Sequence, residues 1–402
     1  MFRCITDLKA LAIDLDSFFN IDISRWERLY KHFKCLFILS EEAAELKIKK
    51  AYPDAVIYHM KHFIKLFAPN QASHVKTLKL LDVKATEMAY LSTDLDFLNH
   101  AMGFLSGTIW MTDSVNYEEA SKSPDLICRN FNALEKALIS HPTGFAGEIT
   151  VYRGEPADGM AIPIEFKIQR NTVPLYMMGR YFGYSHYMNQ LHPYSTAIAL
   201  NKKAGKPYYQ KFDDVFANLY VRAIKKIQKQ GSIDGIVSVP NRPGTPNRFE
   251  QIIAQISQEC NIANLAPHFR CIKSYPTQKY LSSLERQENI KGVFSYEGSL
   301  FEKSIIIIDD IVTTGSTMRE CIKELYAHRA SQIFIVALAI NQIQGSYWSA
   351  DPPQVSCPNC GEKMQLLINS HTKDFFYSCY SCNQTLDFEN GRNILCDCVN
   401  SE

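Results

Sequence analysis

The sequence lacks any run of about eighteen apolar residues, the length that a helix needs to cross a bilayer. Its first residues, MFRCITDLKALAIDLD, lack the apolar core of a secretory signal and already contain aspartates. We therefore expect a cytoplasmic protein without membrane contact. An excess of charge of one sign is also missing, since 43 Lys and Arg face 42 Asp and Glu. The whole molecule is not a polycation, and any contact with nucleic acid must come from a local patch.

Internal repeats and low-complexity tracts are absent as well. The composition, 46% apolar and 21% charged residues, is that of an ordinary globular protein. A length of 402 residues predicts two or three domains. We expect a first domain at 1–140, a second at 148–345 with its most regular part at 233–341, and a small tail unit at 355–402.

The order of apolar and polar stretches predicts the fold class. In the first 140 residues, short apolar runs such as ALAIDLD and CLFILS alternate with helical stretches such as EEAAELKIKKAY. Strands and helices that alternate with short links are typical of a parallel sheet covered by helices. The same alternation returns from Ile233 to Asn341, whereas 148–225 shows no clear pattern. The sequence therefore predicts two parallel-sheet α/β domains and a small cysteine-rich unit.

The twelve cysteines are unevenly distributed. One group is scattered in mostly apolar surroundings, as free buried thiols are: Cys4, Cys35, Cys128, Cys260, Cys271 and Cys321. The other six crowd between residues 357 and 398. This distribution favours a reducing compartment and one local metal site.

The stretch SIIIIDDIVTTGSTMRE (304–320) combines a buried strand with an unusual polar ending. A continuous apolar run is typical of a strand buried on both faces, and TMRECIKELYAHRA has the apolar spacing of a helix. DDIVTTGST then connects the carboxyl end of a core strand to a helix amino terminus, where open parallel sheets bind ligands. Free N–H groups and hydroxyls there favour a phosphate, while Asp309 and Asp310 suit ribose hydroxyls or a hydrated Mg²⁺.

This stretch resembles the phosphoribosyl pyrophosphate (PRPP) motif of type I phosphoribosyltransferases, in which four apolar residues and two acids precede a Thr/Gly-rich loop. The resemblance implies Mg²⁺-dependent binding of PRPP or a nucleotide and transfer or release of a phosphoribosyl group at a nucleobase. It implies a binding site made of Asp309, Asp310, Thr313, Thr314, Gly315, Ser316 and Thr317. A threonine-rich helix cap is the alternative interpretation.

Two stretches before this motif resemble the ComF-type phosphoribosyltransferases associated with bacterial competence. SVPNRPG (238–244) and NRFEQ (247–251) stand where that family has a VPVP strand and RGFNQ, although the glycine of RGFNQ is missing here. A later loop matches at Gln278, Leu281, Arg286, Asn289, Gly292 and Phe294. The resemblance implies a pyrophosphate loop at 238–244 with Arg242 as its cation, and a flexible flap at 275–294.

By the same resemblance, the catalytic candidates are Arg242, Arg286, Asp309 and Asp310. Arginine suits a diphosphate because it is always charged and binds oxygens bidentately. The alternative is that Arg242 is a solvated loop residue, and that Arg286 and Lys279 are exposed charges on a polar flap.

The tail contains CPNC and CYSC separated by eighteen residues. Two C-x₂-C pairs at this spacing predict a structural Zn²⁺ ion held by Cys357, Cys360, Cys379 and Cys382. Cys396 and Cys398 are spare thiols or a replacement ligand. The pattern resembles topoisomerase-type zinc ribbons, in which aromatic residues between the pairs can stack on single-stranded bases. The aromatic residues here, 375–377, either do so or pack against the zinc core or the neighbouring domain, and we favour packing.

The first domain resembles the haloacid dehalogenase-like fold. ALAIDLDSFF matches its D-x-D motif, so that Asp14 and Asp16 would be nucleophile and acid/base, and Ser40 matches the second motif. Asp94 lies in the stretch that resembles the final motif, together with Asp96. The pattern departs from the family because Phe18 replaces a threonine and Thr93 stands near the expected glycine–aspartate pair. The motif lysine is either Lys65 or Lys76. We expect a platform or phosphate sensor, with a phosphatase as the alternative.

Three functions stay open at this point. The first is a phosphoribosyltransferase acting on PRPP or a nucleotide. The second is a nucleic-acid-associated competence or antiviral defence factor that uses the ComF-like fold as scaffold or sensor and binds single strands through its zinc ribbon. The third is a bifunctional phosphatase and phosphoribosyltransferase. A protein partner or a homo-oligomer is compatible with each.

Overall fold

The structure is a computed structural model. It describes residues 8–18, 22–60, 69–102, 104, 106–140, 144–154, 159–183, 186, 188–189, 192–274, 288–343, 355–362, 364–368 and 375–387. Within these ranges, none of the helices combines the length and the apolar character that crossing a membrane requires.

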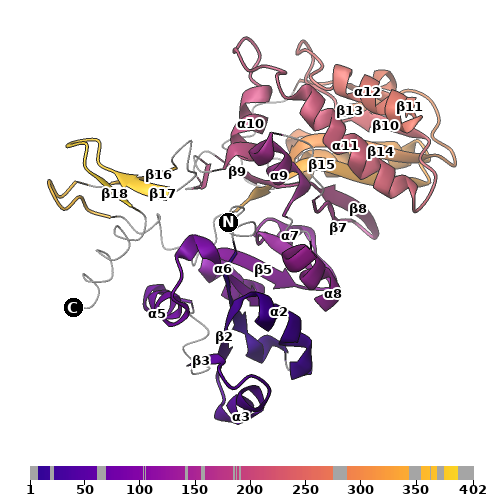
Figure 1. The fold of residues 1–402 in the computed structure, drawn as a ribbon. Coiled ribbons are helices and arrows are strands. Elements are labelled where there is room, and N and C mark those ends of the chain that lie inside the picture. The colour runs from indigo at the N-terminus through magenta and orange to yellow at the C-terminus, as the bar shows by residue number, and fades with distance from the viewer. Residues whose placement is uncertain are drawn as a thin grey trace.

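The first domain is built on a parallel sheet of six described strands, in the order β3-β2-β1-β4-β5-β6 (Figure 1). The strands are β1 (Ala10–Asp14), β2 (Lys34–Leu39), β3 (Val56–His59), β4 (Met88–Ser92), β5 (Gly107–Met111) and β6 (Leu126–Cys128). The described helices around them are α2 (Glu27–His32), α3 (Glu42–Ala51), α5 (Gln71–Leu81), α6 (Leu95–Met102), α7 (Tyr117–Ala120) and α8 (Phe131–Glu135).

Helices cover both faces of this sheet, which explains its continuous apolar strands. Along β1, Ala10 and Ala12 pack into a core that contains residues of α5 and α6. Leu11 and Ile13 pack into a second core with residues of α2, α3 and α8. Successive side chains of a strand point to opposite faces, so both layers are needed to bury β1. The predicted parallel-sheet domain is therefore present.

The second domain contains a mixed sheet in the order β11-β10-β14-β15-β8-β7, with β9 pairing with β15. Its strands are β7 (Ile162–Ile168), β8 (Asn171–Met177), β9 (Arg180–Phe182), β10 (Gly235–Ser238), β11 (Ala263–Asn264), β14 (Ser304–Val312) and β15 (Gln332–Gln342). The helices are α9 (Ala146–Arg153), α10 (Pro193–Asn201), α11 (Asp213–Gln228), α12 (Glu250–Cys260) and α14 (Ser316–Ala327). A separate antiparallel pair consists of β12 (Phe269–Cys271) and β13 (Phe294–Tyr296).

The central strand of this sheet is β14, which pairs in parallel with β10 and β15. Its isoleucines alternate between two cores: Ile305 and Ile307 face one, Ile306 and Ile308 the other. The strand continues to Val312, so Asp309 and Asp310 lie inside it and not in the loop that the sequence predicted. The loop proper is only Thr313–Gly315, followed by α14.

The segment 148–225, which showed no clear pattern, completes the second domain. An antiparallel hairpin of β7 and β8 extends the sheet beyond β15, and α11 packs against α12. The apolar residues of β7 alternate with other residues along IPIEFKI, as in a strand with one buried face, but Pro163 and Pro174 within the two strands argue against a strand interior. The predicted domain limits stay predictions, but the hairpin shows that this segment shares one sheet with 233–341.

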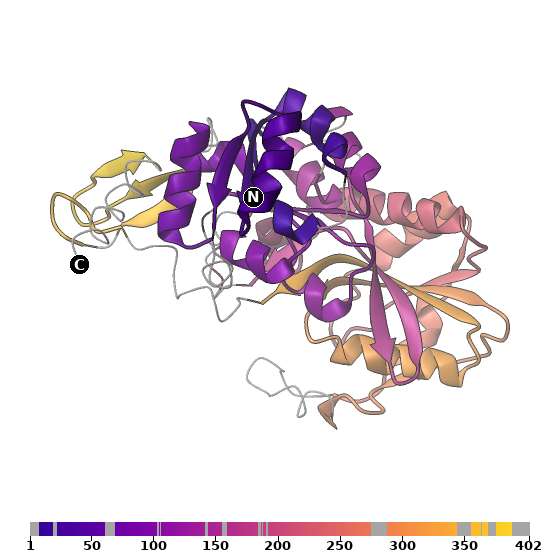
Figure 2. The same cartoon turned by 90° about the horizontal axis from the view of Figure 1, so that it is seen from below.

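The tail forms a three-stranded antiparallel sheet of β16 (Gln365–Ile368), β17 (Phe375–Ser378) and β18 (Thr385–Asp387). It projects from one end of the molecule in both views (Figures 1 and 2). A small apolar cluster joins it to both domains, because Val355, Met364 and Tyr377 pack in one group with Ala85 and Phe182.

A buried ion-pair cluster joins the two α/β domains. Arg180 on β9 donates from Nε and Nη2 to the two carboxylate oxygens of Glu148 on α9, each at 2.9 Å. The same Nη2 donates to Asp125, just before β6 of the first domain, at 2.9 Å. His192 Nε2 lies 3.3 Å from Glu148 Oε2. Although burial opposes ionisation, the charges of Arg180 and His192 hold the pKa of Glu148 well below its usual range.

Backbone contacts extend this junction along the end of β15. Gln342 accepts a hydrogen bond from the Ser123 N–H at 2.8 Å and donates to the Ala120 carbonyl at 3.0 Å. The Ile343 N–H donates to the Ser121 carbonyl at 2.8 Å. On the hairpin side, the Glu165 N–H donates to Val115 at 2.9 Å. The first domain is therefore docked on the second through buried polar groups.

We predict that Arg180→Met lowers the free energy of unfolding by ~3–5 kcal/mol, because it removes the guanidinium that pairs with two buried carboxylates. Arg28→Met is a matched control, since Arg28 is 61% exposed and pairs with Glu135 at the surface. That change should cost less than about 1 kcal/mol. Urea denaturation of both variants measures the difference, and equal losses would contradict the role of the buried cluster.

Candidate functional site

The loop between β14 and α14 is shaped for close approach of a ligand. Gly315 has φ 72°, and a Cβ there would lie 2.8 Å from the Phe166 ring, so other residues are strained at this position. Ser316 begins α14, whose first N–H groups have no partner within the helix. These N–H groups and the Thr317 hydroxyl make the amino terminus of α14 suitable for binding an anion.

Two residues whose side chains pack against the Phe166 ring donate hydrogen bonds to carbonyls of this loop. The hydroxyl of Tyr117, on α7 of the first domain, donates to the Thr313 carbonyl. Arg319 Nη1 donates to the Thr314 carbonyl at 2.8 Å, and its guanidinium lies over the Phe166 ring. Because both carbonyls are engaged, the conformation of the loop depends on the first domain as well as on the second. The sequence carried no signal of this contact.

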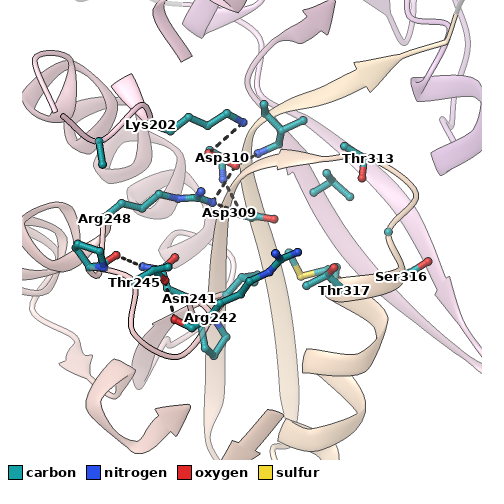
Figure 3. A pocket seen from close by; sticks show the side chains of 18 of the residues that line it. Lys202, Asn241, Arg242, Thr245, Arg248, Asp309, Asp310, Thr313, Ser316 and Thr317 are labelled. Atoms are coloured by element: carbon teal, nitrogen blue, oxygen red, sulfur yellow. Dashed lines mark hydrogen bonds and ion pairs between the residues drawn. The ribbon is translucent and has the colours of Figure 1, made fainter. Parts of the chain in front are cut away.

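A cavity of about 450 Å³ lies beside the loop (Figure 3). It is lined by residues from the end of α10, the loop after β10, β14 and the start of α14. All the described candidates of the PRPP motif line it except Thr314, and Arg242 does so too. Figure 3 shows Arg242 extending from its loop into the cavity. The structure therefore brings together the residues that the motif predicted.

The Arg242 loop is held by its own hydrogen bonds. The Thr245 hydroxyl donates to the Arg242 carbonyl at 2.6 Å, and Asn241 Nδ2 donates to the Pro246 carbonyl at 2.6 Å. The predicted flap is only partly visible, because Arg286, Lys279, Gln278 and Leu281 lie outside the described residues. Gly292, near its end, donates its N–H to Glu320 on α14 at 2.8 Å.

Two cations contact the acid pair, and the sequence reasoning named neither. Arg248 Nη2 lies 3.4 Å from Asp309 Oδ1 and 3.1 Å from Asp310 Oδ1. Lys202 Nζ, just after α10, lies 3.7 Å from Asp310 Oδ2. The one available signal was NRFEQ, where Arg248 stands at the position of the missing glycine. Burial, together with the charge of Asp310, raises the pKa of Asp309 to about 7.

The acid pair does not fit a directly bound Mg²⁺ ion. Mg²⁺ requires octahedral oxygen ligands and uses carboxylates whose charge is available to it. Here the two carboxylates already face Arg248 and Lys202, and backbone N–H groups of Asp310 and Ile311 bind one oxygen of each, at 2.9 and 2.7 Å. The Mg²⁺ of the family resemblance stays a prediction.

The aspartates predicted in the first domain also come together, at the carboxyl ends of β1, β2 and β4. The Ser40 N–H donates to Asp16 at 2.8 Å, and the Ser92 hydroxyl donates to Asp14 at 2.7 Å. Asp94 accepts from the N–H groups of Asp96 and Phe97 at the start of α6. Asp94 therefore acts as a helix cap.

This arrangement is poorly suited to nucleophilic attack. Asp14 is 0% exposed and shares its carboxylate with Ser92. Of the two candidate lysines, Lys65 lies outside the described residues. Lys76 Nζ lies 4.4 Å from the ring centre of Tyr58 on β3, an edge strand of the sheet. Phosphatase chemistry needs a lysine that offsets the clustered acids, and the described structure does not supply one at Asp14.

The four predicted zinc ligands form a cluster in the tail. The Sγ atoms of Cys357, Cys360, Cys379 and Cys382 all lie within 4.8 Å of one another. The closest pairs are 3.5 Å and 3.4 Å apart. Four thiolates around Zn²⁺ at about 2.3 Å from the metal require such a spacing, so the residues fit a structural zinc ion. Cys396 and Cys398 lie outside the described residues.

Tyr377, one of the aromatic residues between the cysteine pairs, is 2% exposed and packs in the apolar cluster with Phe182. The favoured interpretation, packing instead of base stacking, is therefore correct for Tyr377. By contrast, Tyr380 within CYSC is 68% exposed.

Comparison with known proteins identifies the second domain. Residues 222–365 match the family described as phosphoribosyl transferase domain. This part of the chain therefore has the predicted type I phosphoribosyltransferase fold, and the match covers a minority of the whole chain. The resemblance of the first domain to haloacid dehalogenases has no such support and stays a prediction.

Two relatives refine the class. Competence protein F of Haemophilus influenzae is 32% identical over 96 residues, which are 23% of this chain and 42% of the relative. DNA utilization protein YhgH of Escherichia coli is 36% identical over 62 residues, which are 15% of this chain and 27% of the relative. The chain thus spans less than half the length of these relatives, and it is similar to them in its ComF-like part.

We predict one zinc ion per chain, measured by inductively coupled plasma mass spectrometry on purified protein. Cys357→Ser combined with Cys360→Ser should release it, because two ligands cannot complete a tetrahedral site. Cys396→Ser and Cys398→Ser serve as controls that should retain the metal. Loss of zinc in either control variant would show that the ligand set is wrong.

Proposed function

We propose that this protein is phosphoribosyltransferase-like and binds PRPP or a nucleotide through its 5′-phosphate at the β14–α14 loop. The observation that carries the proposal is the position of this loop beside a cavity that also contains Asp309, Asp310 and Arg242. Phosphate, ribose hydroxyls and a further anionic group are the features that such a set of residues recognises.

In this proposal the protein acts by positioning and electrostatics. The amino terminus of α14 and its hydroxyls hold the 5′-phosphate, and the acid pair accepts hydrogen bonds from ribose hydroxyls. Arg242 faces the group that leaves or enters at C1, where positive charge develops on the sugar. No covalent nucleophile is required, since orientation and charge stabilisation lower the barrier.

The first domain has a structural role in the same proposal. Tyr117 binds the Thr313 carbonyl of the ligand loop, and the buried Arg180 cluster fixes the domain in place. A docked platform of this kind explains why the fold is retained although Asp14 is buried. The bifunctional alternative has no support from the described site.

A second candidate function is nucleic-acid association, which the names of the two relatives, competence protein F and DNA utilization protein YhgH, favour. The loop after α10 supports it, because Lys203, Lys206 and Lys211 are exposed there together with Tyr208, which is 55% exposed. Basic and aromatic residues together suit single strands. Fluorescence anisotropy with a single-stranded oligonucleotide tests this candidate, and an unchanged signal at low salt would exclude it.

We predict that Thr317→Asp weakens binding of PRPP and of ribose 5-phosphate by at least about tenfold, because a carboxylate at the start of α14 repels a phosphate. In Thr317→Asn the new side chain has nearly the shape of aspartate without its charge, so this variant should change the affinity far less. Isothermal titration calorimetry measures both. If Thr317→Asp binds as wild type does, the phosphate does not occupy this loop.

A further inference from the structure

Arg248 occupies the place where the acid pair would receive a cation. Its Nη2 atom lies within 3.4 Å of one oxygen of Asp309 and 3.1 Å of one oxygen of Asp310. The side chain is 31% exposed, so it is partly withdrawn from water beside two largely buried carboxylates. Figure 3 shows Arg248 and Lys202 reaching the acids from the same side of the picture. A metal cation at the position of the Arg248 guanidinium would find both carboxylates already in ion pairs with Arg248.

The four carboxylate oxygens are not all engaged. Arg248 and backbone N–H groups take Oδ1 of both residues, and Lys202 lies near Oδ2 of Asp310. Asp309 Oδ2 makes no hydrogen bond or ion pair among the described residues. It is therefore the atom that can accept a ribose hydroxyl while Arg248 keeps its position.

The charges around the cavity set a limit on the ligand. Among the described residues, three cations line it, Lys202, Arg242 and Arg248, against the two acids Asp309 and Asp310. A phosphate monoester carries about −1.5 to −2 at neutral pH. The excess positive charge of these described lining residues, with the amino terminus of α14, suits one such group. Free PRPP carries a diphosphate in addition, for which the described lining residues supply no further cation.

We propose that this site binds a sugar phosphate with one phosphate monoester, such as the phosphoribosyl part of a nucleoside 5′-monophosphate, without a divalent cation, and that Arg248 is the internal cation that makes this possible. The inference rests on the proposed function and narrows its ligand. Arg248 is a positioning and specificity residue: it neutralises the acids so that they do not repel the phosphate, and it opposes a metal ion by like charge.

The test is titration calorimetry of the full chain with ribose 5-phosphate and, separately, PRPP. Each titration is run in magnesium-free buffer without chelator, which leaves the zinc ribbon intact, and with magnesium chloride. We expect the Kd of ribose 5-phosphate to change by less than about threefold between the buffers. We expect PRPP to bind no more tightly than ribose 5-phosphate in either buffer.

Variants of Arg248 test its role. Arg248→Gln leaves the acids with Lys202 alone, so magnesium-free affinity for ribose 5-phosphate should fall at least about tenfold and recover with magnesium. Arg248→Lys keeps the charge and should remain insensitive to magnesium. Arg28→Gln removes a surface arginine of the first domain and is the control that should match wild type. Thermal melting shows whether each variant is folded; if Arg248→Gln is not, the wild-type comparison decides.

Each outcome has a distinct meaning. Wild-type binding that requires magnesium overturns the inference and leaves the proposed function standing. Tighter binding of PRPP than of ribose 5-phosphate overturns it too. Magnesium-independent binding in folded Arg248→Gln shows that Arg248 is not the internal cation. Absence of binding by both ligands in both buffers overturns the proposed function together with this inference.

Discussion

The rest of the structure depends on the buried contact of Arg180 with Glu148 and Asp125. Burying three charges is costly, and the cost is offset only when every partner is in place, so the cluster allows one arrangement of the two sheets. The cluster connects β9 and α9 of the second domain with Asp125, the residue directly before β6 of the first domain. A weaker surface contact would allow the domains to move relative to each other.

The junction also affects the ligand site, because a residue of the first domain contacts the β14–α14 loop. Because α7 is docked against the β7–β8 hairpin, Tyr117 can bind the carbonyl of Thr313 while Arg319 binds that of Thr314. These two bonds fix the loop directly before the amino terminus of α14. A domain whose own acidic cluster is buried thus still contributes to the site of its neighbour, which gives a physical reason for the fusion of the two.

The electrostatics of the site depart from what its motif implies. Two adjacent acids near a strand end normally bind a metal cation. Here Arg248 and Lys202 of the protein itself provide the positive charge. The raised pKa of Asp309 reflects burial and the neighbouring carboxylate, and the positive charge of Arg248 limits the rise. Arg248, which stands in NRFEQ where RGFNQ has a glycine, therefore changes the site, because its guanidinium pairs with both acids.

The sequence by itself determined the local features: the doubly buried β14 from its isoleucines, the loop around Gly315 from its hydroxyl residues, and the cysteine cluster from two C-x₂-C pairs. Each follows from periodicity or short spacing, which act between near neighbours in the chain. Only the tertiary structure decided that Arg248 and Lys202 meet Asp310, that Tyr117 meets Thr313 and that Arg180 meets Asp125. These partners are 55 to 196 residues apart. A single sequence does not show which of these residues meet, because the pairs form only when packed sheets bring distant loops together.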